Sequence, residues 1–199
     1  MHPRSCSHSR GQNFGVFHHR LGVAGYLHGM RIFLTGYMGS GKSTAGAELA
    51  EVTNLAFVDL DDWIEEHSGL TISQWFSELG EDEFRLEEAY QLEQVIELYP
   101  NAVIATGGGT PCFQDNFAKM QDAGITVYMQ WSQQDLFTNL KGAAAHRPLL
   151  SGKSDEDIRT FIAEHLPKRE PQYLLSEYVV DAKNTSMQEL SGPLDDHAK

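Results

Sequence analysis

The stretch Gly36-Tyr-Met-Gly-Ser-Gly-Lys-Ser43 decides the fold of this 199-residue chain. It matches the pattern Gly-x-x-x-x-Gly-Lys-Ser/Thr, in which glycines let backbone N–H groups turn inward around phosphate oxygens. The apolar run Arg31–Thr35 comes directly before it, and residues 43–52 after it have the apolar pattern of a helix. A strand, a phosphate loop and a helix N-terminus in this order predict a nucleoside-triphosphate site.

Each residue type in this loop has a physical task. Lys42 brings a full positive charge to the β- and γ-phosphates, and the Ser43 hydroxyl can ligate Mg²⁺. The phosphate contacts are expected from one continuous segment: Gly39, Ser40, Gly41, Lys42, Ser43 and Thr44.

Strand-like and helix-like segments alternate after residue 30. The strand-like runs are residues 31–35, 55–60, 102–106, 125–131 and 178–182. Such alternation predicts a three-layer α/β/α domain over residues 30–199, with a central parallel sheet of five strands. Residues 81–98 read as one long helix. A helix is expected over about residues 155–166, followed by a separate segment over residues 169–175. Residues 186–190 are expected to form little more than a turn before Gly192-Pro193.

Residues 1–29 differ from the rest because they contain arginines and no acidic residue. They lack the apolar core of a secretory signal. We interpret them as a disordered leader, with an organellar transit segment as the alternative.

Composition narrows the function further. A net charge of −13 with only 15 lysines and arginines argues against a nucleic-acid partner. No apolar stretch is long enough to span a membrane. Two distant cysteines predict no disulfide framework and fit a cytoplasmic enzyme, and the nine histidines lack zinc-protease spacing. We expect a monomer.

Acidic and basic residues follow the later strands. Asp59 and Asp61 end the second strand, where open α/β sheets bind ligands, although Asp61 could simply cap the next helix. Arg85 and Glu88 lie one helical turn apart, either as a surface pair or as an arginine oriented to grip an anion.

Three consecutive glycines follow the next strand. Gly107-Gly108-Gly109 suggests that a ligand lies directly against the backbone. Two cationic segments, Arg147-Pro-Leu-Leu150 and Lys168-Arg169, lie further along. Residues 141–154 read as a mobile lid.

Taken together, the segments GYMGSGKST, VDLDDWIE, GEDEFR, ATGGG, RPLL and REPQY resemble the shikimate kinase family over about residues 30–182. The resemblance implies a P-loop kinase of the nucleoside-monophosphate-kinase type. It also implies transfer of the γ-phosphoryl group of ATP to the 3-hydroxyl of shikimate, with Mg²⁺, on the route to chorismate and aromatic amino acids.

The resemblance also implies a role for each matching residue. Lys42, Asp61 and Arg147 would be catalytic, and Ser43 and Asp59 would hold the metal. The shikimate contacts would come from acidic, basic, glycine and aromatic positions: Asp61, Arg85, Gly107, Gly108, Gly109, Arg169, Phe76 and Phe84. On the nucleotide side, Arg147 and Lys141 would add to the loop, but an arginine usual near adenine is replaced, so that only Lys141 remains there.

Two other functions fit the same residues. A gluconate-kinase-like enzyme would use the same scaffold on a different small acid, and a binding module of this fold would bind without catalysis. The GEDEFR and RPLL segments favour the shikimate interpretation over the first. The retention of Lys42, Asp61 and the arginines favours it over the second.

Overall fold

A computed structural model describes residues 17–18, 29–141, 150 and 152–197. The centre of the fold is a parallel sheet of five strands, which confirms the predicted architecture: β2 (Arg31–Thr35), β3 (Ala56–Asp59), β4 (Ala102–Ala105), β5 (Ile125–Gln130) and β6 (Tyr178–Asp181). Their order across the sheet is β6-β5-β2-β4-β3. The first strand of this series, β2, therefore lies in the middle, with crossover helices on both sides.

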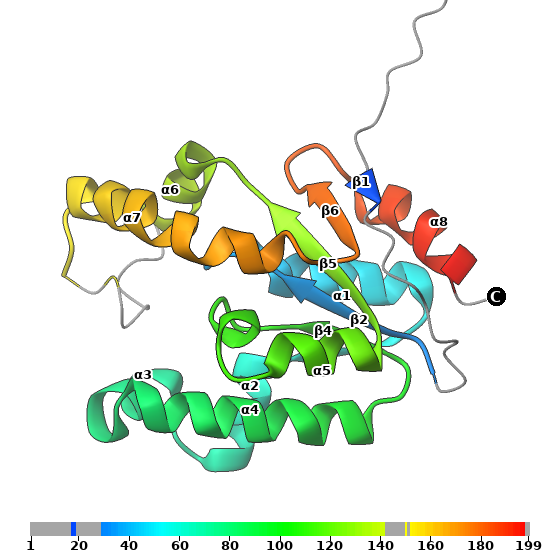
Figure 1. The fold of residues 1–199 in the computed structure, drawn as a ribbon, viewed down its shortest axis with the longest axis horizontal. Coiled ribbons are helices and arrows are strands. Elements are labelled where there is room, and N and C mark those ends of the chain that lie inside the picture. The colour runs from blue at the N-terminus through cyan, green and yellow to red at the C-terminus, as the bar shows by residue number, and fades with distance from the viewer. Residues whose placement is uncertain (1–16, 19–28, 142–149, 151, 198–199) are drawn as a thin grey trace, which may run out of the picture.

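A short strand extends the sheet at one edge. β1 (Phe17–His18) pairs antiparallel with β6, beyond the five parallel strands (Figure 1). The sequence pattern did not predict it, because two residues carry no detectable alternation. The other residues of the predicted leader up to residue 28 lie outside the described part of the chain.

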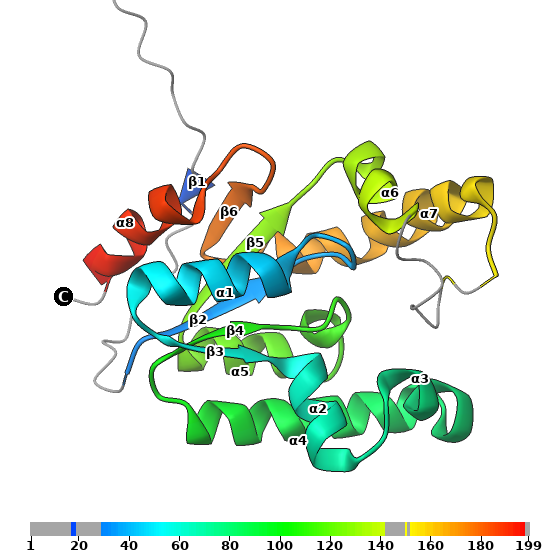
Figure 2. The same ribbon diagram turned by 180° about the vertical axis from the view of Figure 1, so that it is seen from behind.

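Helices cover the two faces of the sheet. α1 (Lys42–Thr53) and α8 (Met187–His197) cover one face, as Figure 2 shows. A second cluster packs against α2 (Leu60–Ser68), α4 (Glu81–Leu98) and α5 (Asn116–Ala123), and Figure 1 shows α5 on the opposite face of the sheet, toward the viewer. A third group, α6 (Gln133–Lys141) and α7 (Asp155–Tyr173), packs beside the phosphate loop. Three short pieces complete the fold: α3 (Ile72–Gln74), η1 (Trp75–Leu79) and η2 (Thr110–Cys112).

Alternation along the central strand explains why both faces are covered. Ile32 and Leu34 pack into the cluster under α1 and α8, whereas Phe33 between them packs into the cluster under α4 and α5. All three side chains are fully buried. A strand that is apolar on both faces needs a helical layer on each side, as predicted.

Helix α7 corrects one prediction. The expected end at about Leu166 is wrong, because the helix runs without interruption through Pro167 and Pro171 to Tyr173. Proline removes one hydrogen bond and crowds the preceding turn. Here burial of Leu166 and Tyr173 on the inner face, and a hydrogen bond from the Tyr128 hydroxyl to Glu170 (3.0 Å), hold the helix against the sheet.

The C-terminal helix, α8, corrects a second prediction. Instead of a single turn, α8 spans 11 residues and contains Pro193. Met187, Leu190 and Leu194 are buried at helical spacing against α1 and the sheet. Glu189 and Ser186 form reciprocal hydrogen bonds at the N-terminus of the helix (2.9–3.2 Å). Packing and capping outweigh the loss at the proline.

The parallel arrangement places the ends of three strands at one edge of the sheet. β2 ends before the phosphate loop, β3 ends at Asp59, and β4 leads into the three glycines. The register pairs Ala105 with both Leu34 and Asp59, so the ends of these three strands are level. The phosphate loop, Asp59 and the three glycines therefore meet where open α/β sheets bind ligands.

Candidate active site

The phosphate loop is held by contacts from two other segments. The Trp131 indole donates to the carbonyl oxygen of Ser40 (2.9 Å), and the Asn139 amide donates to that of Gly39 (3.1 Å). Gly39 adopts φ +77°, and a Cβ on it would lie 2.7 Å from a methyl of Leu140. Only glycine fits this position without strain. The loop is therefore fixed by packing as well as by its own turn.

Lys42 lies along the loop that it follows. Its Nζ donates to the carbonyl oxygens of Gly36 (2.9 Å) and Tyr37 (3.0 Å) and to the hydroxyl of Ser40 (3.2 Å). All three acceptors are neutral oxygens, and Nζ carries the positive charge of the ammonium group. A phosphate placed against the loop would meet that charge.

A polar cavity opens above this loop. It is lined by eight residues that the sequence had assigned to phosphate, metal or acceptor, namely Gly39, Gly41, Lys42, Ser43, Thr44, Asp59, Asp61 and Gly108, together with Met38 and Thr106. Ser40 lies beside it, with its hydroxyl against Lys42.

Asp59 has two tasks at this cavity. Its Oδ1 caps α2 by accepting from the backbone N–H groups of Asp61 (3.0 Å) and Asp62 (3.5 Å). The alternative in which Asp61 caps this helix is therefore wrong, because Asp59 fills the capping position. Both capping bonds use Oδ1 of the carboxylate. A carboxylate and the Ser43 hydroxyl in one cavity form a donor set that suits Mg²⁺, which keeps several waters.

A second cavity adjoins the first on the side of α4. Its lining contains every residue predicted for the acid substrate: Asp61, Phe76, Phe84, Arg85, Gly107, Gly108, Gly109 and Arg169. Met38, Ile72 and Glu88 complete it. Three residues line both cavities, namely Met38, Asp61 and Gly108. Asp61 is the one carboxylate shared by the two linings, so it lies where a phosphate and a hydroxyl would meet.

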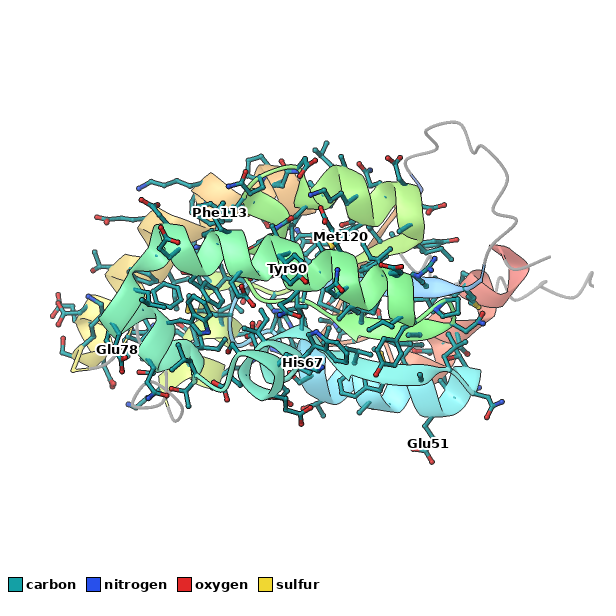
Figure 3. The ribbon with its side chains drawn as sticks, turned by 90° about the horizontal axis from the view of Figure 1, so that it is seen from below. Glu51, His67, Glu78, Tyr90, Phe113 and Met120 are labelled. Carbon is teal, nitrogen blue, oxygen red and sulfur yellow. The ribbon has the colours of Figure 1, made fainter. Side chains whose placement is uncertain are left out.

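Arg85 is held from both sides by carboxylates. Nη1 donates to Glu88 Oε2 (3.0 Å) on the inside, and Nη2 and Nε donate to Glu81 Oε1 (2.8 and 3.3 Å) on the outside. Arg85 is 5% exposed and Glu88 fully buried, so the alternative of a surface ion pair is wrong. Figure 3 shows the outer side of α4, where Tyr90 faces solvent.

Aromatic rings fix the plane of this guanidinium. The Cζ of Arg85 lies 4.3 Å from the ring centroid of Phe113 and 5.1 Å from that of Phe84. Phe76 packs on Phe84 with centroids 4.9 Å apart. These contacts restrict an otherwise flexible side chain and favour two-pronged binding of a carboxylate.

The second arginine contacts the glycine loop from α7. Arg169 on α7 donates through Nη1 to the carbonyl oxygen of Gly108 (3.2 Å), and the Tyr173 hydroxyl donates to the same oxygen (2.5 Å). Arg85 packs against the neighbouring Gly109. Two arginines from helices far apart in the sequence thus face one cavity across one loop.

Sequence reasoning missed three contacts of this site. Met38 lies at the second variable position of the phosphate loop, where the motif specifies no residue. Ile72 and Phe113 belong to short segments without periodicity. The reciprocal cap between Thr71 and Gln74 was predictable, and it fixes the turn that carries Ile72.

The two residues predicted to add to the loop on the nucleotide side have different outcomes. Arg147 lies outside the described residues, as does most of the predicted lid. Lys141 ends α6, where its Nζ pairs with Asp155 Oδ2 (2.5 Å) and it is not part of either cavity lining.

A phosphate loop and a two-arginine pocket that share one aspartate define a P-loop kinase for a small anionic acceptor. The sequence model of the shikimate kinase family matches residues 38–193. The chain belongs to the shikimate kinase family.

Comparisons with individual proteins agree with this family assignment. The shikimate kinase of Parabacteroides distasonis is 45% identical over 153 residues, which cover 77% of this chain and 88% of the relative. A crystal structure of shikimate kinase from Bacteroides thetaiotaomicron superposes with a TM-score of 0.74 at 39% identity, covering 84% of this chain and 95% of that one. Shikimate kinase from Acinetobacter baumannii in complex with shikimate gives 0.72 at 29% identity, covering 83% and 90%.

Two further observations concern the described residues alone. Every helix there is too short or too polar to span a bilayer. Within the same ranges, His, Cys, Asp and Glu side chains do not gather in groups of three that could hold a metal ion.

Proposed function

We propose that this chain transfers the γ-phosphoryl group of ATP to the 3-hydroxyl of shikimate, giving shikimate 3-phosphate and ADP. The observation that carries the proposal is that the phosphate cavity and the two-arginine cavity share Asp61 and Gly108. A donor and an acceptor bound in adjoining cavities would react at these residues. The relative from Acinetobacter baumannii, solved with shikimate, supports the choice of acceptor.

The acceptor is held by its two ends. Arg85 and Arg169 bind the carboxylate, because both guanidinium groups line the cavity and Arg85 is already oriented by Glu88. Phe76 and Phe84 form an apolar wall for the ring carbons. The backbone of Gly108 and Gly109 contacts ring hydroxyls. These contacts position the acceptor and contribute orientation rather than covalent chemistry.

Asp61 faces the reacting hydroxyl. It accepts a hydrogen bond from that group and takes up its proton as the new bond to phosphorus forms. Lys42 and the backbone N–H groups of residues 39–44 neutralise the charge on the phosphate oxygens. Ser43 and Asp59 would hold Mg²⁺, which would neutralise phosphate charge when bound. Arg147 is proposed to close over the γ-phosphate.

The test is ADP formation by the purified chain with ATP, Mg²⁺ and shikimate, compared with gluconate as acceptor. We expect turnover with shikimate only, and loss of turnover when EDTA removes the metal. ADP formation with gluconate but not with shikimate would overturn the acceptor assignment. Binding of shikimate without turnover under any metal condition would instead indicate a non-catalytic binding module.

The proposed partners are therefore ATP, ADP and shikimate, in a monomeric cytoplasmic enzyme. The products would feed chorismate and aromatic amino acid synthesis. Light scattering of the purified chain tests the oligomeric state directly.

A further inference from the structure

Thr110 lies behind the two-arginine cavity and is not among its lining residues. It is the first residue of η2 and is fully buried. Its Oγ1 donates to Glu88 Oε1 (2.6 Å), while Glu88 Oε2 accepts from Arg85 Nη1 (3.0 Å). A hydroxyl and a guanidinium therefore hold the two oxygens of one buried carboxylate.

We propose that Thr110 is a positioning residue for acceptor binding, which acts through Glu88 to fix the orientation of Arg85. The inference rests on the proposed function, since it concerns the arginine that grips the acceptor carboxylate.

The backbone fixes Thr110 independently of Glu88. Its N–H donates to the carbonyl oxygen of Gly107 (3.2 Å), and its own carbonyl oxygen accepts from the Asn116 amide (3.1 Å). Asn116 is itself fully buried. The hydroxyl is thus presented from a rigid support, and the carboxylate must adapt to it.

Gly107 shows how tightly these groups are packed. A Cβ on this residue would lie 2.7 Å from Glu88 Oε1 and 2.9 Å from both Thr110 Oγ1 and Asp61 Oδ1. Oxygens from three segments therefore surround one glycine. Thr110 links the glycine loop, which would contact the acceptor hydroxyls, to the arginine that would bind its carboxylate.

The charges around Glu88 explain why one hydroxyl matters. Burial raises the pKa of Glu88, and Arg85, then the Thr110 hydrogen bond, then the more distant Arg169 lower it. The other ionisable groups facing it are Asp61 across Gly107 and the Cys112 thiol on η2. Loss of the hydroxyl removes one of the contacts that favour the ionised form.

Glu81 determines the direction in which Arg85 would move when Glu88 is protonated. It binds Arg85 from the outside, and its side chain is 42% exposed, whereas that of Glu88 is 1% exposed. When Glu88 is protonated, its attraction for Arg85 weakens and Glu81 becomes the stronger partner. The guanidinium then turns outward, away from the position that faces Arg169 and the acceptor.

The experiment compares Thr110→Val, which keeps the shape but removes the donor, with Thr110→Ser, which keeps the donor. At pH 7 we expect Thr110→Val to raise the KM for shikimate about fivefold to tenfold, the scale of one typical hydrogen bond, because the hydroxyl acts on Arg85 only through Glu88. The KM for ATP should not change. The KM defect should shrink as pH rises from 6 to 8.5, because a raised pKa of Glu88 is overcome by higher pH. Thr110→Ser should restore the wild-type values.

A double-mutant cycle separates positioning from general loosening. Glu88→Gln should raise the shikimate KM by itself, and adding Thr110→Val should raise it little further, because both changes act on one contact. Additive effects, or a Thr110→Val enzyme with wild-type KM and pH profile, would overturn the inference. If Thr110→Val fails to fold, the test is Thr110→Ser, and an altered shikimate KM in that variant would also overturn the inference. Absence of shikimate turnover in the wild type contradicts the proposed function instead.

Discussion

A methyl group on Gly109 would lie 2.6 Å from the Cζ of Arg85, so this guanidinium packs directly on the glycine loop. Gly109 has φ −93° and ψ −28°, a conformation open to any residue. The glycine is therefore required for the space it leaves to Arg85 and not for its backbone freedom.

The first prediction follows from this contact. Gly109→Ala should displace Arg85 and raise the KM for shikimate about tenfold or more, the scale expected when a positioned group moves by about 1 Å. Steady-state kinetics with each substrate varied would measure it. Gly192→Ala is the matched control, since a Cβ there meets nothing within 4 Å on α8. A Gly109→Ala enzyme that matches this control in shikimate KM would contradict the packing argument.

The second prediction separates the structural and functional roles of Arg85. Arg85→Met leaves the buried Glu88 without its cation, which should destabilise the fold by about 3–5 kcal/mol and abolish shikimate binding. Adding Glu88→Gln removes the unpaired charge while keeping an acceptor for Thr110. Stability measured by urea unfolding should then recover, whereas shikimate binding should not. Recovery of both would exclude Arg85 from the binding site.

The third prediction concerns the aspartate shared by the two cavities. Asp61→Asn should lower kcat by about 10²-fold or more, the scale of a positioned general base. The neighbouring Asp62 is exposed and lines neither cavity, so Asp62→Asn is the control. Single-turnover measurements would separate the chemical step from product release. Equal kcat values for the two variants would refute the assignment of Asp61.

The fourth prediction is a pH dependence of stability from His165. Burial, followed by the charges of Arg169 and Lys168, lowers the pKa of this histidine below its ordinary value of 6.5. Above 6.5 the imidazole is neutral in both folded and unfolded chains, so it has no effect on stability. As pH falls through 6.5 the unfolded chain takes up the proton first, so folding stability is lost on acidification.

His165→Gln should therefore lose less stability than the wild type between pH 7.5 and 5.5. Urea midpoints across this range would measure the difference. His67→Gln is a suitable control, because His67 is exposed on α2. Parallel pH profiles for the wild type and His165→Gln would show that this histidine is not linked to folding.

Local sequence pattern was enough for much of the fold. The bounds of α4 were predicted to the residue, and β2 likewise, because each has strong signals at its ends. The phosphate loop was predictable because its chemistry depends on neighbouring residues in one turn. Sequence reasoning ended one helix too early, at about Leu166, and expected only a turn before Pro193. Both helices continue through their prolines because Leu166 and Leu194 are buried.

The sequence by itself determined which groups are available: a phosphate loop, two aspartates, three glycines, and arginines at 85 and 169. It left open whether Arg85 and Glu88 form a surface pair or a buried one. Tertiary structure decided this, because exposure depends on what packs against α4 from segments far away in the chain. The same holds for the contact of Thr110 with Glu88, 22 residues apart. Periodicity in the sequence indicates which side chains lie on one face of a helix. Which polar groups from other segments contact that face depends on how the helix packs against the rest of the fold.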